Sequence, residues 1–219
     1  KILGCSPEEM RFANNSVYSS LDKGKKLGFE QLVTICQKKG VSLSHSEIYQ
    51  GPQTDWNEEN GQGAPYFDYT FGAIGTIVDV NLHTGYPKVL RIVAAYDCGK
   101  VINPLSAAGQ VEGAVVQGLG YAVMEEVCTK EGAIVNPNLA DYFICTAVDS
   151  PEIETFFVED YPSGYGPFGA KCIAEPPLDI VAPAVLQAIF SATGVRIRDL
   201  PASAEKILLG LDRQERTRR

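Results

Sequence analysis

Residues 169–178 read Gly-Ala-Lys-Cys-Ile-Ala-Glu-Pro-Pro-Leu, and this stretch decides how the rest of the chain is interpreted. It places one carboxylate, Glu175, between a run of small side chains and two prolines. Because a following proline disfavours the α region, we expect Glu175 to have an extended backbone. Pro177 fixes its own φ and has no N–H to donate. The pattern therefore predicts a carboxylate held in one direction, with room beside it at Ala170 and Ala174.

The same pattern also has an ordinary structural interpretation. An acidic residue in a solvated loop ahead of a helix is stabilised by the dipole of the helix start and needs no chemical role. The residues of this stretch alone favour that simpler interpretation of Glu175.

A second stretch, residues 103–126, predicts a long helix. Asn103 has the residue type of an N-cap, and Pro104 suits the first helical position because its missing N–H would be unpaired there anyway. Each glycine inside a helix costs about 1 kcal/mol relative to alanine, and this helix contains Gly109, Gly113, Gly118 and Gly120. We interpret them as places where another backbone or a ligand approaches closely.

One face of this predicted helix carries two amides. At about 100° per residue, Gln110 and Gln117 lie about 20° apart, and Gly113 and Tyr121 share their face. Amides both donate and accept hydrogen bonds, which suits a polar heterocycle. A helix–helix crossing with small residues at the contact explains the pattern equally well, and both interpretations stay open.

Both stretches resemble the molybdenum hydroxylases, the family of xanthine dehydrogenase and aldehyde oxidase. Residues 169–178 are similar to that family's Gly-Glu-Pro-Pro loop, which carries the catalytic base, with Ala174 and Cys172 where the family usually has glycine. Residues 97–104, which read Asp-Cys-Gly-Lys-Val-Ile-Asn-Pro, and residues 109–120 are similar to the run before and along the helix that contacts the pterin.

The resemblance runs from about residue 29 to residue 209. Residues 136–142 continue it, while Cys98 and Cys145 depart from it at positions where valine and proline are commoner. It implies an α+β fold, the C-terminal portion of the molybdopterin-binding domain of the xanthine dehydrogenase and aldehyde oxidase family. We assign residues 1–211 to this domain and residues 212–219 to a frayed basic tail, and we interpret residues 50–65 as a polar loop or linker. We expect the upstream half of the subunit to be missing, so that this chain alone is catalytically incomplete.

The resemblance also implies the chemistry of the site. Glu175 would be the general base in the hydroxylation of a heteroaromatic (purine-like or nicotinate-like) or aldehyde carbon, with water as the oxygen source. The family's pterin-contacting glutamine corresponds to Gln110, and the further candidate cofactor contacts are Gly113, Gln117, Lys171 and Cys172. The implied cofactor is molybdenum–molybdopterin, with the cytosine dinucleotide form left open. Iron–sulfur clusters and FAD are expected on partner subunits or domains.

Composition limits the alternatives. A net charge of −8 over 219 residues argues against a nucleic-acid or anionic-membrane surface. We find no apolar stretch near the roughly 18 residues that span a bilayer, and we expect a cytoplasmic protein. The six cysteines form no C-x-x-C pair and there are two histidines, so we predict no metal ligands in this chain. Residues 164–169 match G-x-G-x-x-G, but the prolines that follow argue against a dinucleotide-binding helix.

Two other functions stay open. One is a cofactor-free scaffold that docks partner subunits and keeps the motifs for packing. The other, a glutamate-dependent hydrolase, is weaker because no second acid or nucleophile lies at a useful spacing. Residues that would choose among xanthine, nicotinate, another purine or an aldehyde as the substrate are expected upstream.

Periodicity and capping residues predict the remaining elements. These are a short helix opening at Ser6, with Glu9 closing a capping box, a helix over 29–38 ended by Gly40, a hairpin with strands over 74–81 and 89–95, and a strand over 152–159. The apolar run over 178–192 predicts a helix that starts near residues 180–183 and is capped by Gly194, and a last helix is predicted over 202–209.

Overall fold

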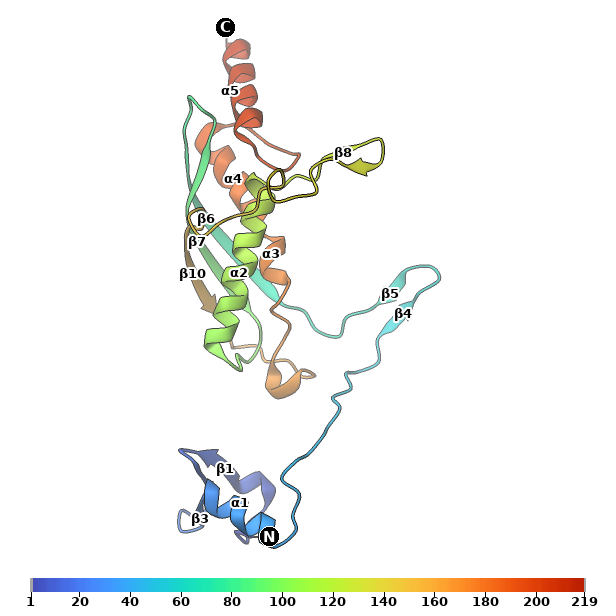
Figure 1. The fold of residues 1–219 in the computed structure, drawn as a ribbon, viewed down its shortest axis with the longest axis vertical. Helices are drawn as coiled ribbons and strands as arrows, with labels where there is room; N and C mark the ends of the chain where they lie inside the picture. Colours follow the sequence, from blue (N-terminus) through green and yellow to red (C-terminus); the bar gives the residue numbers. More distant parts are fainter. Residues whose placement is uncertain (1, 219) are drawn as a thin grey trace. The chain divides into compact units, whose positions relative to one another are not determined.

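The structure, a computed structural model, describes residues 2–218, and of Arg218 only the backbone. The chain forms two compact units, Lys1–Gln50 (unit 1) and Gly51–Arg219 (unit 2), whose elements are labelled in Figure 1. The single domain predicted over residues 1–211 is divided between these two units.

Unit 1 is a three-stranded antiparallel sheet followed by one helix. Its strands β1 (Met10–Ala13), β2 (Ser16–Ser19) and β3 (Lys26–Gly28) lie in the order β1-β2-β3. Asn14 and Asn15 have φ of 49° and 52°, as a two-residue hairpin turn requires. Helix α1 (Phe29–Lys38) has the predicted bounds, and Gly40 follows it with φ 62°.

The prediction of a helix that opens at Ser6 is wrong. The structure has a single 3-10 turn, η1 (Pro7–Glu9), and the Ser6 side chain caps nothing. The Glu9 carboxylate accepts a hydrogen bond from Ser19 Oγ at 3.2 Å. Pairing between β1 and β2 thus outweighs the local helix signal.

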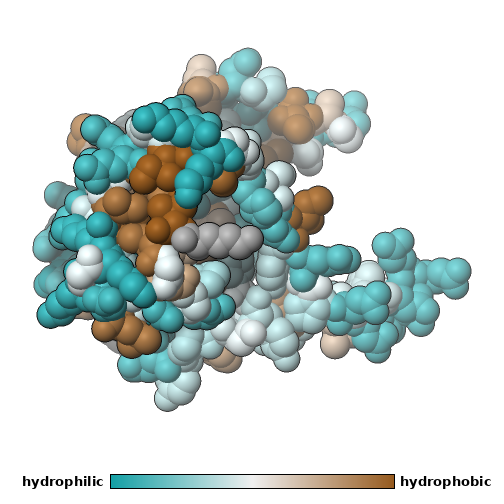
Figure 2. All heavy atoms as spheres, turned by 90° about the horizontal axis from the view of Figure 1, so that it is seen from below, coloured by the Kyte–Doolittle hydropathy of each residue, from teal (hydrophilic) through white to brown (hydrophobic). Residues whose placement is uncertain are grey.

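Several apolar side chains of unit 1 face solvent. Figure 2, the view from below, shows hydrophobic residues gathered on the near face with hydrophilic residues around them. The large apolar residues of this unit that stay exposed are Phe12, Leu21, Phe29, Val41, Leu43, Ile48 and Tyr49.

Unit 2 is built on a three-stranded sheet in the order β10-β7-β6. Strands β6 (Phe71–Val80) and β7 (Pro87–Asp97) form the predicted hairpin, with a register shift at Ile77/Val78. Strand β10 (Glu152–Phe157) runs parallel to β7 on its other side. Every second residue of β7 from Ile92 onward is buried, so one face of the sheet is committed to the core.

Three helices pack on this sheet. Helix α2 (Pro104–Val123) contacts β10, α4 (Val181–Thr193) contacts β6, and the short α3 (Pro176–Asp179) contacts α2 and β6 (Figure 1). The core brings together fully buried residues of three elements: Ile92, Ala94 and Tyr96 of β7, Val111, Val115 and Leu119 of α2, and Val181, Val185 and Ile189 of α4. As predicted, the regular apolar helix begins beyond Ile180 and ends at Gly194, whose φ is 72°.

Two small hairpins and a last helix complete unit 2. Strands β4 (Asp55–Asn57) and β5 (Gln62–Ala64) pair within the stretch predicted as a loop or linker, and β8 (Thr129–Lys130) pairs with β9 (Ala133–Ile134). Helix α5 (Ala204–Arg218) extends well beyond its predicted end. The basic tail is therefore helical as far as Arg218, while Arg219 lies outside the described residues.

One helical stretch passes a length and composition test for a membrane span, against our expectation that none would. It covers Pro176–Thr193, with a mean hydropathy of 1.2. The stretch breaks between α3 and α4, and Val181, Val185 and Ile189 are fully buried in the core of unit 2. We interpret it as a core helix.

Candidate functional site

The loop that carries Glu175 begins as an addition to the end of β7. Gly99 and Ala170 form an antiparallel β-bridge, and the Lys171 N–H donates to the Cys98 carbonyl at 2.8 Å. The Lys100 N–H donates to the Gly169 carbonyl at 2.9 Å. These bonds fix residues 169–171 against the segment that leads from β7 into α2.

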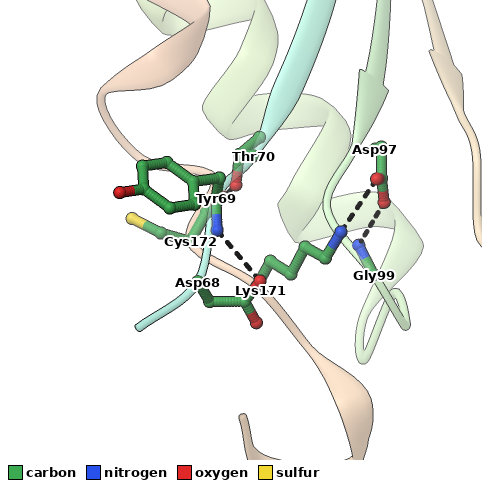
Figure 3. Close-up of polar contacts among 7 residues, drawn as sticks. All are labelled: Asp68, Tyr69, Thr70, Asp97, Gly99, Lys171 and Cys172. Carbon is green, nitrogen blue, oxygen red and sulfur yellow. Dashed lines mark hydrogen bonds and ion pairs between the residues drawn. The ribbon is translucent and has the colours of Figure 1, made fainter. Parts of the chain in front are cut away.

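A nearly buried ion pair lies directly beside this bridge (Figure 3). Lys171 Nζ is 2.8 Å from Asp97 Oδ2, and the two side chains are only 8% and 12% exposed. The other oxygen, Asp97 Oδ1, accepts a hydrogen bond from the Gly99 N–H at 3.1 Å. The ammonium of Lys171, a candidate cofactor contact, is thus paired within this chain.

Cys172 follows with its side chain exposed and its backbone held. The Cys172 carbonyl accepts a hydrogen bond from Thr70 Oγ1, just before β6. A third segment of unit 2 therefore holds the loop.

Glu175 differs from its predicted conformation. Its φ and ψ are −94° and −38°, in the α region rather than extended. A following proline disfavours this region without forbidding it, and here Glu175 caps α3, where its carbonyl accepts the Leu178 N–H at 2.9 Å. Its side chain is exposed, and within the described part of the chain its carboxylate makes no hydrogen bond or ion pair.

Pro177, the second proline after Glu175, is held by a contact with strand β7. Pro177 is buried, and its carbonyl accepts a hydrogen bond from the Tyr96 hydroxyl at 3.3 Å. Burial, with a smaller contribution from the Asp179 charge, raises the pKa of Tyr96 to about 12, so the phenol remains a donor at neutral pH. Gly72 lies opposite Tyr96, where a Cβ would come within 2.2 Å of the ring. Glycine at position 72 is therefore what lets the ring lie there.

Helix α2 presents its predicted amide face to solvent. Gln110, Gly113 and Gln117 are all exposed, as is Tyr121. The Asn103 side chain caps the helix by accepting the Ser106 N–H at 3.1 Å.

The glycines of α2 differ in their surroundings, and a Cβ on Gly120 would meet the Glu125 side chain. A Cβ on Gly118 would lie 2.7 Å from Val181 Cβ and 2.9 Å from the Leu178 carbonyl oxygen, so this glycine serves a helix crossing. A Cβ on Gly109 or Gly113 would meet nothing within 4 Å. The helix-crossing interpretation is therefore confirmed at Gly118, and the contact of Gly113 with a cofactor stays a prediction.

The structure brings the predicted residues to two neighbouring places in unit 2. Gln110, Gly113 and Gln117 lie on the exposed face of α2, while Lys171 and Cys172 lie in the loop held by the end of β7. Glu175 opens α3, which packs against α2. Sequence reasoning missed the anchors of this loop: Asp97 lay within a quoted motif but had no assigned role, and Tyr96 and Thr70 gave no signal.

The side chains on the exposed face of α2 are of a kind that suits a polar heterocyclic cofactor. Among the described residues no group of His, Cys, Asp or Glu could hold a metal ion. The open space at Gly113 and the flanking amides supply what a pterin needs instead, namely close approach and hydrogen bonds.

Known proteins place these features in a family context. A family model described as a molybdopterin cofactor-binding domain matches residues 1–151. The xanthine dehydrogenase molybdenum-binding subunit of Escherichia coli O157:H7 is 39% identical over 136 residues, which cover 60% of this chain and 18% of that protein.

Solved structures agree. The aldehyde oxidoreductase of Desulfovibrio desulfuricans ATCC 27774 superposes with a TM-score of 0.63 and 34% identity, covering 70% of this chain and 17% of that one. Quinoline 2-oxidoreductase of Pseudomonas putida 86 gives a TM-score of 0.71 over 96% of this chain and 27% of that one, and at 24% identity it shows the fold alone. The chain thus spans a small part of the proteins it matches.

Proposed function

Because the chain belongs to the molybdopterin cofactor-binding domain family, we propose that it forms the C-terminal part of the molybdenum-binding subunit of a molybdenum hydroxylase. The enzyme oxidises a carbon of a heteroaromatic ring or an aldehyde and takes the added oxygen from water. The observation that carries this proposal is Glu175, whose backbone is held by neighbouring elements while its carboxylate stays unpaired within the described residues.

Helix α2 is the proposed cofactor contact in this chain. Gln110 and Gln117 can donate and accept hydrogen bonds, and Gly113 leaves open space between them. When bound, molybdopterin supplies a redox-active metal centre that takes up the two electrons of substrate oxidation. The cytosine dinucleotide form of the cofactor stays a proposal.

Glu175 is the proposed general base. One of its carboxylate oxygens accepts the proton that water gives up as its oxygen is added to the substrate carbon. A well-placed base of this kind contributes roughly 10²- to 10⁴-fold to the rate. Within the described residues Glu175 has no competing ion pair, so its carboxylate is free to accept that proton.

Substrate and partners follow by analogy with relatives. Two of the proteins named above are a xanthine dehydrogenase subunit and an aldehyde oxidoreductase, and we propose a purine-like or nicotinate-like heterocycle or an aldehyde as the substrate here. The upstream part of the subunit would complete the pocket, and iron–sulfur and flavin partners would remove the electrons. A cytoplasmic location is part of the same proposal.

Replacing Glu175 with glutamine in the assembled enzyme tests the base directly. We expect turnover to fall at least about 100-fold, because the proton acceptor is lost. Molybdenum and pterin content should stay near normal. The matched control is Glu126→Gln, which changes an exposed glutamate just beyond α2 and should leave turnover unchanged.

Two outcomes would contradict the proposal. More than about a tenth of normal turnover in Glu175→Gln would remove the base assignment. Absence of molybdenum and pterin from the natively purified complex would indicate a cofactor-free scaffold instead.

A further inference from the structure

Two consecutive residues of β7 hold the two ends of the segment that contains Glu175. Asp97 binds Lys171 at the start of this segment, with 2.8 Å between Asp97 Oδ2 and Lys171 Nζ. Tyr96 binds Pro177 at its end, through a hydrogen bond of 3.3 Å to the Pro177 carbonyl. Glu175 lies between the two attachments and has no side-chain partner of its own among the described residues.

On the basis of the proposed function, we propose that Asp97–Lys171 and Tyr96–Pro177 form a two-point clamp whose role is to position the Glu175 carboxylate for proton transfer. Lys171, Asp97 and Tyr96 are then positioning residues, and Lys171 acts on Glu175 through the backbone rather than by touching the cofactor.

The chemistry of the first attachment supports this role. An ion pair that is only 8% and 12% exposed fixes geometry closely, since loss of one partner would leave the other charge unpaired away from water. Both Asp97 oxygens are engaged, one by Lys171 and the other by the Gly99 N–H. The carboxylate therefore holds the bridged segments at residues 99 and 170 together from one side (Figure 3).

The second attachment, between Tyr96 and Pro177, depends on a buried ring rather than on an ion pair. The Tyr96 ring is buried against Gly72, so its hydroxyl has a fixed position beside the Pro177 carbonyl. Pro177 itself has restricted φ and lies in the first turn of α3, where the Glu175 carbonyl accepts the Leu178 N–H. A shift of the Pro177 carbonyl would thus be passed to Glu175 through a stiff backbone.

The neighbouring pair Lys100–Glu159 provides a matched comparison. It joins the same region of the chain, because the Lys100 N–H donates to the Gly169 carbonyl. Its side chains are much more exposed, at 59% and 38%. Exposed pairs of this kind fix geometry weakly, so we expect no positioning role for the Lys100 side chain.

The test uses three variants of the assembled enzyme. Tyr96→Phe removes only the hydroxyl. The paired change Asp97→Asn with Lys171→Met removes both charges together, because either single change would leave a buried charge without its partner. Lys100→Met is the control.

Three properties are measured in each variant: kcat and KM, molybdenum and pterin content, and hydrogen exchange of the peptide covering residues 171–178. The Lys171 and Leu178 amides, both hydrogen-bonded, report on the two ends of the segment. We expect both clamp variants to exchange faster in this peptide and to lose roughly 10- to 100-fold in kcat, since displacement of a reacting group by about 1 Å has effects of that size. KM and cofactor content should stay unchanged, and Lys100→Met should match the parent enzyme.

Each other outcome overturns the clamp in a distinct way. Unchanged exchange would show that the attachments do not order the segment. Faster exchange with normal kcat, while Glu175→Gln is inactive, would leave the base intact and remove the positioning role. Loss of molybdenum in the paired variant would make Lys171 a cofactor contact. An active Glu175→Gln enzyme would overturn the proposed function itself, and a positioning role for the clamp with it.

Discussion

At the scale of single residues, Glu175 has its backbone held at the start of α3 while its side chain stays exposed. The following proline disfavours the α region, yet Glu175 occupies it, because the first turn of α3 returns a hydrogen bond from Leu178. The sequence pattern was enough to single out Glu175 as a candidate residue. The backbone conformation of Glu175 could not be predicted, because it depends on the helix that starts after it. The contacts of Tyr96 and Asp97 could not be predicted either, because folding brings them together with segments distant in the sequence.

Gly118 and Gly113 of α2 give a paired prediction at this scale. Gly118→Ala should destabilise the chain by about 1–3 kcal/mol, because its Cβ would overlap Val181 and the Leu178 carbonyl. Gly113→Ala, with open space around it, should instead stabilise the chain by up to about 1 kcal/mol through helix propensity. Urea unfolding of both variants measures the difference. Equal effects would show that the α2–α3–α4 contact tolerates a methyl group.

Gln110 carries a separate prediction about the cofactor. Gln110→Ala should lower the molybdenum and pterin content of the assembled enzyme, because one amide of the proposed contact face is removed. The change should leave the stability of the subunit almost unchanged, since Gln110 is exposed in this chain. Gln187→Ala, an exposed glutamine on α4, is the control. Normal cofactor content in Gln110→Ala would contradict the contact.

Among the elements, those with strong periodicity and a clear cap were predictable from sequence. Helix α1, the β6–β7 hairpin, α2 and α4 lie where the pattern placed them, and both Asn103 and Gly194 act as expected. The β1–β2 hairpin was not predictable in the same way, because its short strands carry no long alternation and Ser6-Pro7 imitates a helix start. The β4–β5 hairpin was missed because residues 50–65 are polar and rich in glycine.

The connection between β10 and α2 predicts a pH dependence. Glu159, just after β10, accepts hydrogen bonds from Lys100 Nζ and from the Val101 N–H, and these interactions lower the pKa of its carboxyl. A lowered folded-state pKa contributes stability above the unfolded value of about 4.3 and loses it as the pH falls through the folded value. Glu159→Gln should therefore be less stable than the parent near neutral pH, and the difference should shrink below about pH 4.

Unfolding midpoints of the two proteins in urea, compared from neutral to acidic pH, measure this effect. Glu126→Gln serves as control because its carboxylate makes no bond among the described residues. A stability difference between Glu159→Gln and the parent that stays constant over this pH range would show that the charge of the Glu159 carboxylate plays no part.

At the scale of the whole molecule, the decisive observation is how small a part of its relatives this chain matches. The chain matches only 18% of the length of a xanthine dehydrogenase subunit and 17% of an aldehyde oxidoreductase. Glu175, Gln110 and Gln117 are all exposed here, as residues would be if a further part of the subunit closed over them.

We therefore expect the 219-residue chain by itself to give no turnover with heterocyclic or aldehyde substrates. Activity should appear only when the chain is combined with the remainder of its subunit and loaded with cofactor. Assays of both preparations, normalised to molybdenum content, measure this. Turnover by the isolated chain would mean that it already holds a complete pocket.

The contact between Gly72 and the Tyr96 ring has a consequence for how this protein tolerates variation. Any side chain at position 72 would push against the ring, since even a methyl group would overlap it. A displaced ring would move its hydroxyl away from Pro177 and so disturb the position of Glu175. In a survey of random substitutions scored by turnover, position 72 should therefore show losses, although glycine offers no functional group of its own.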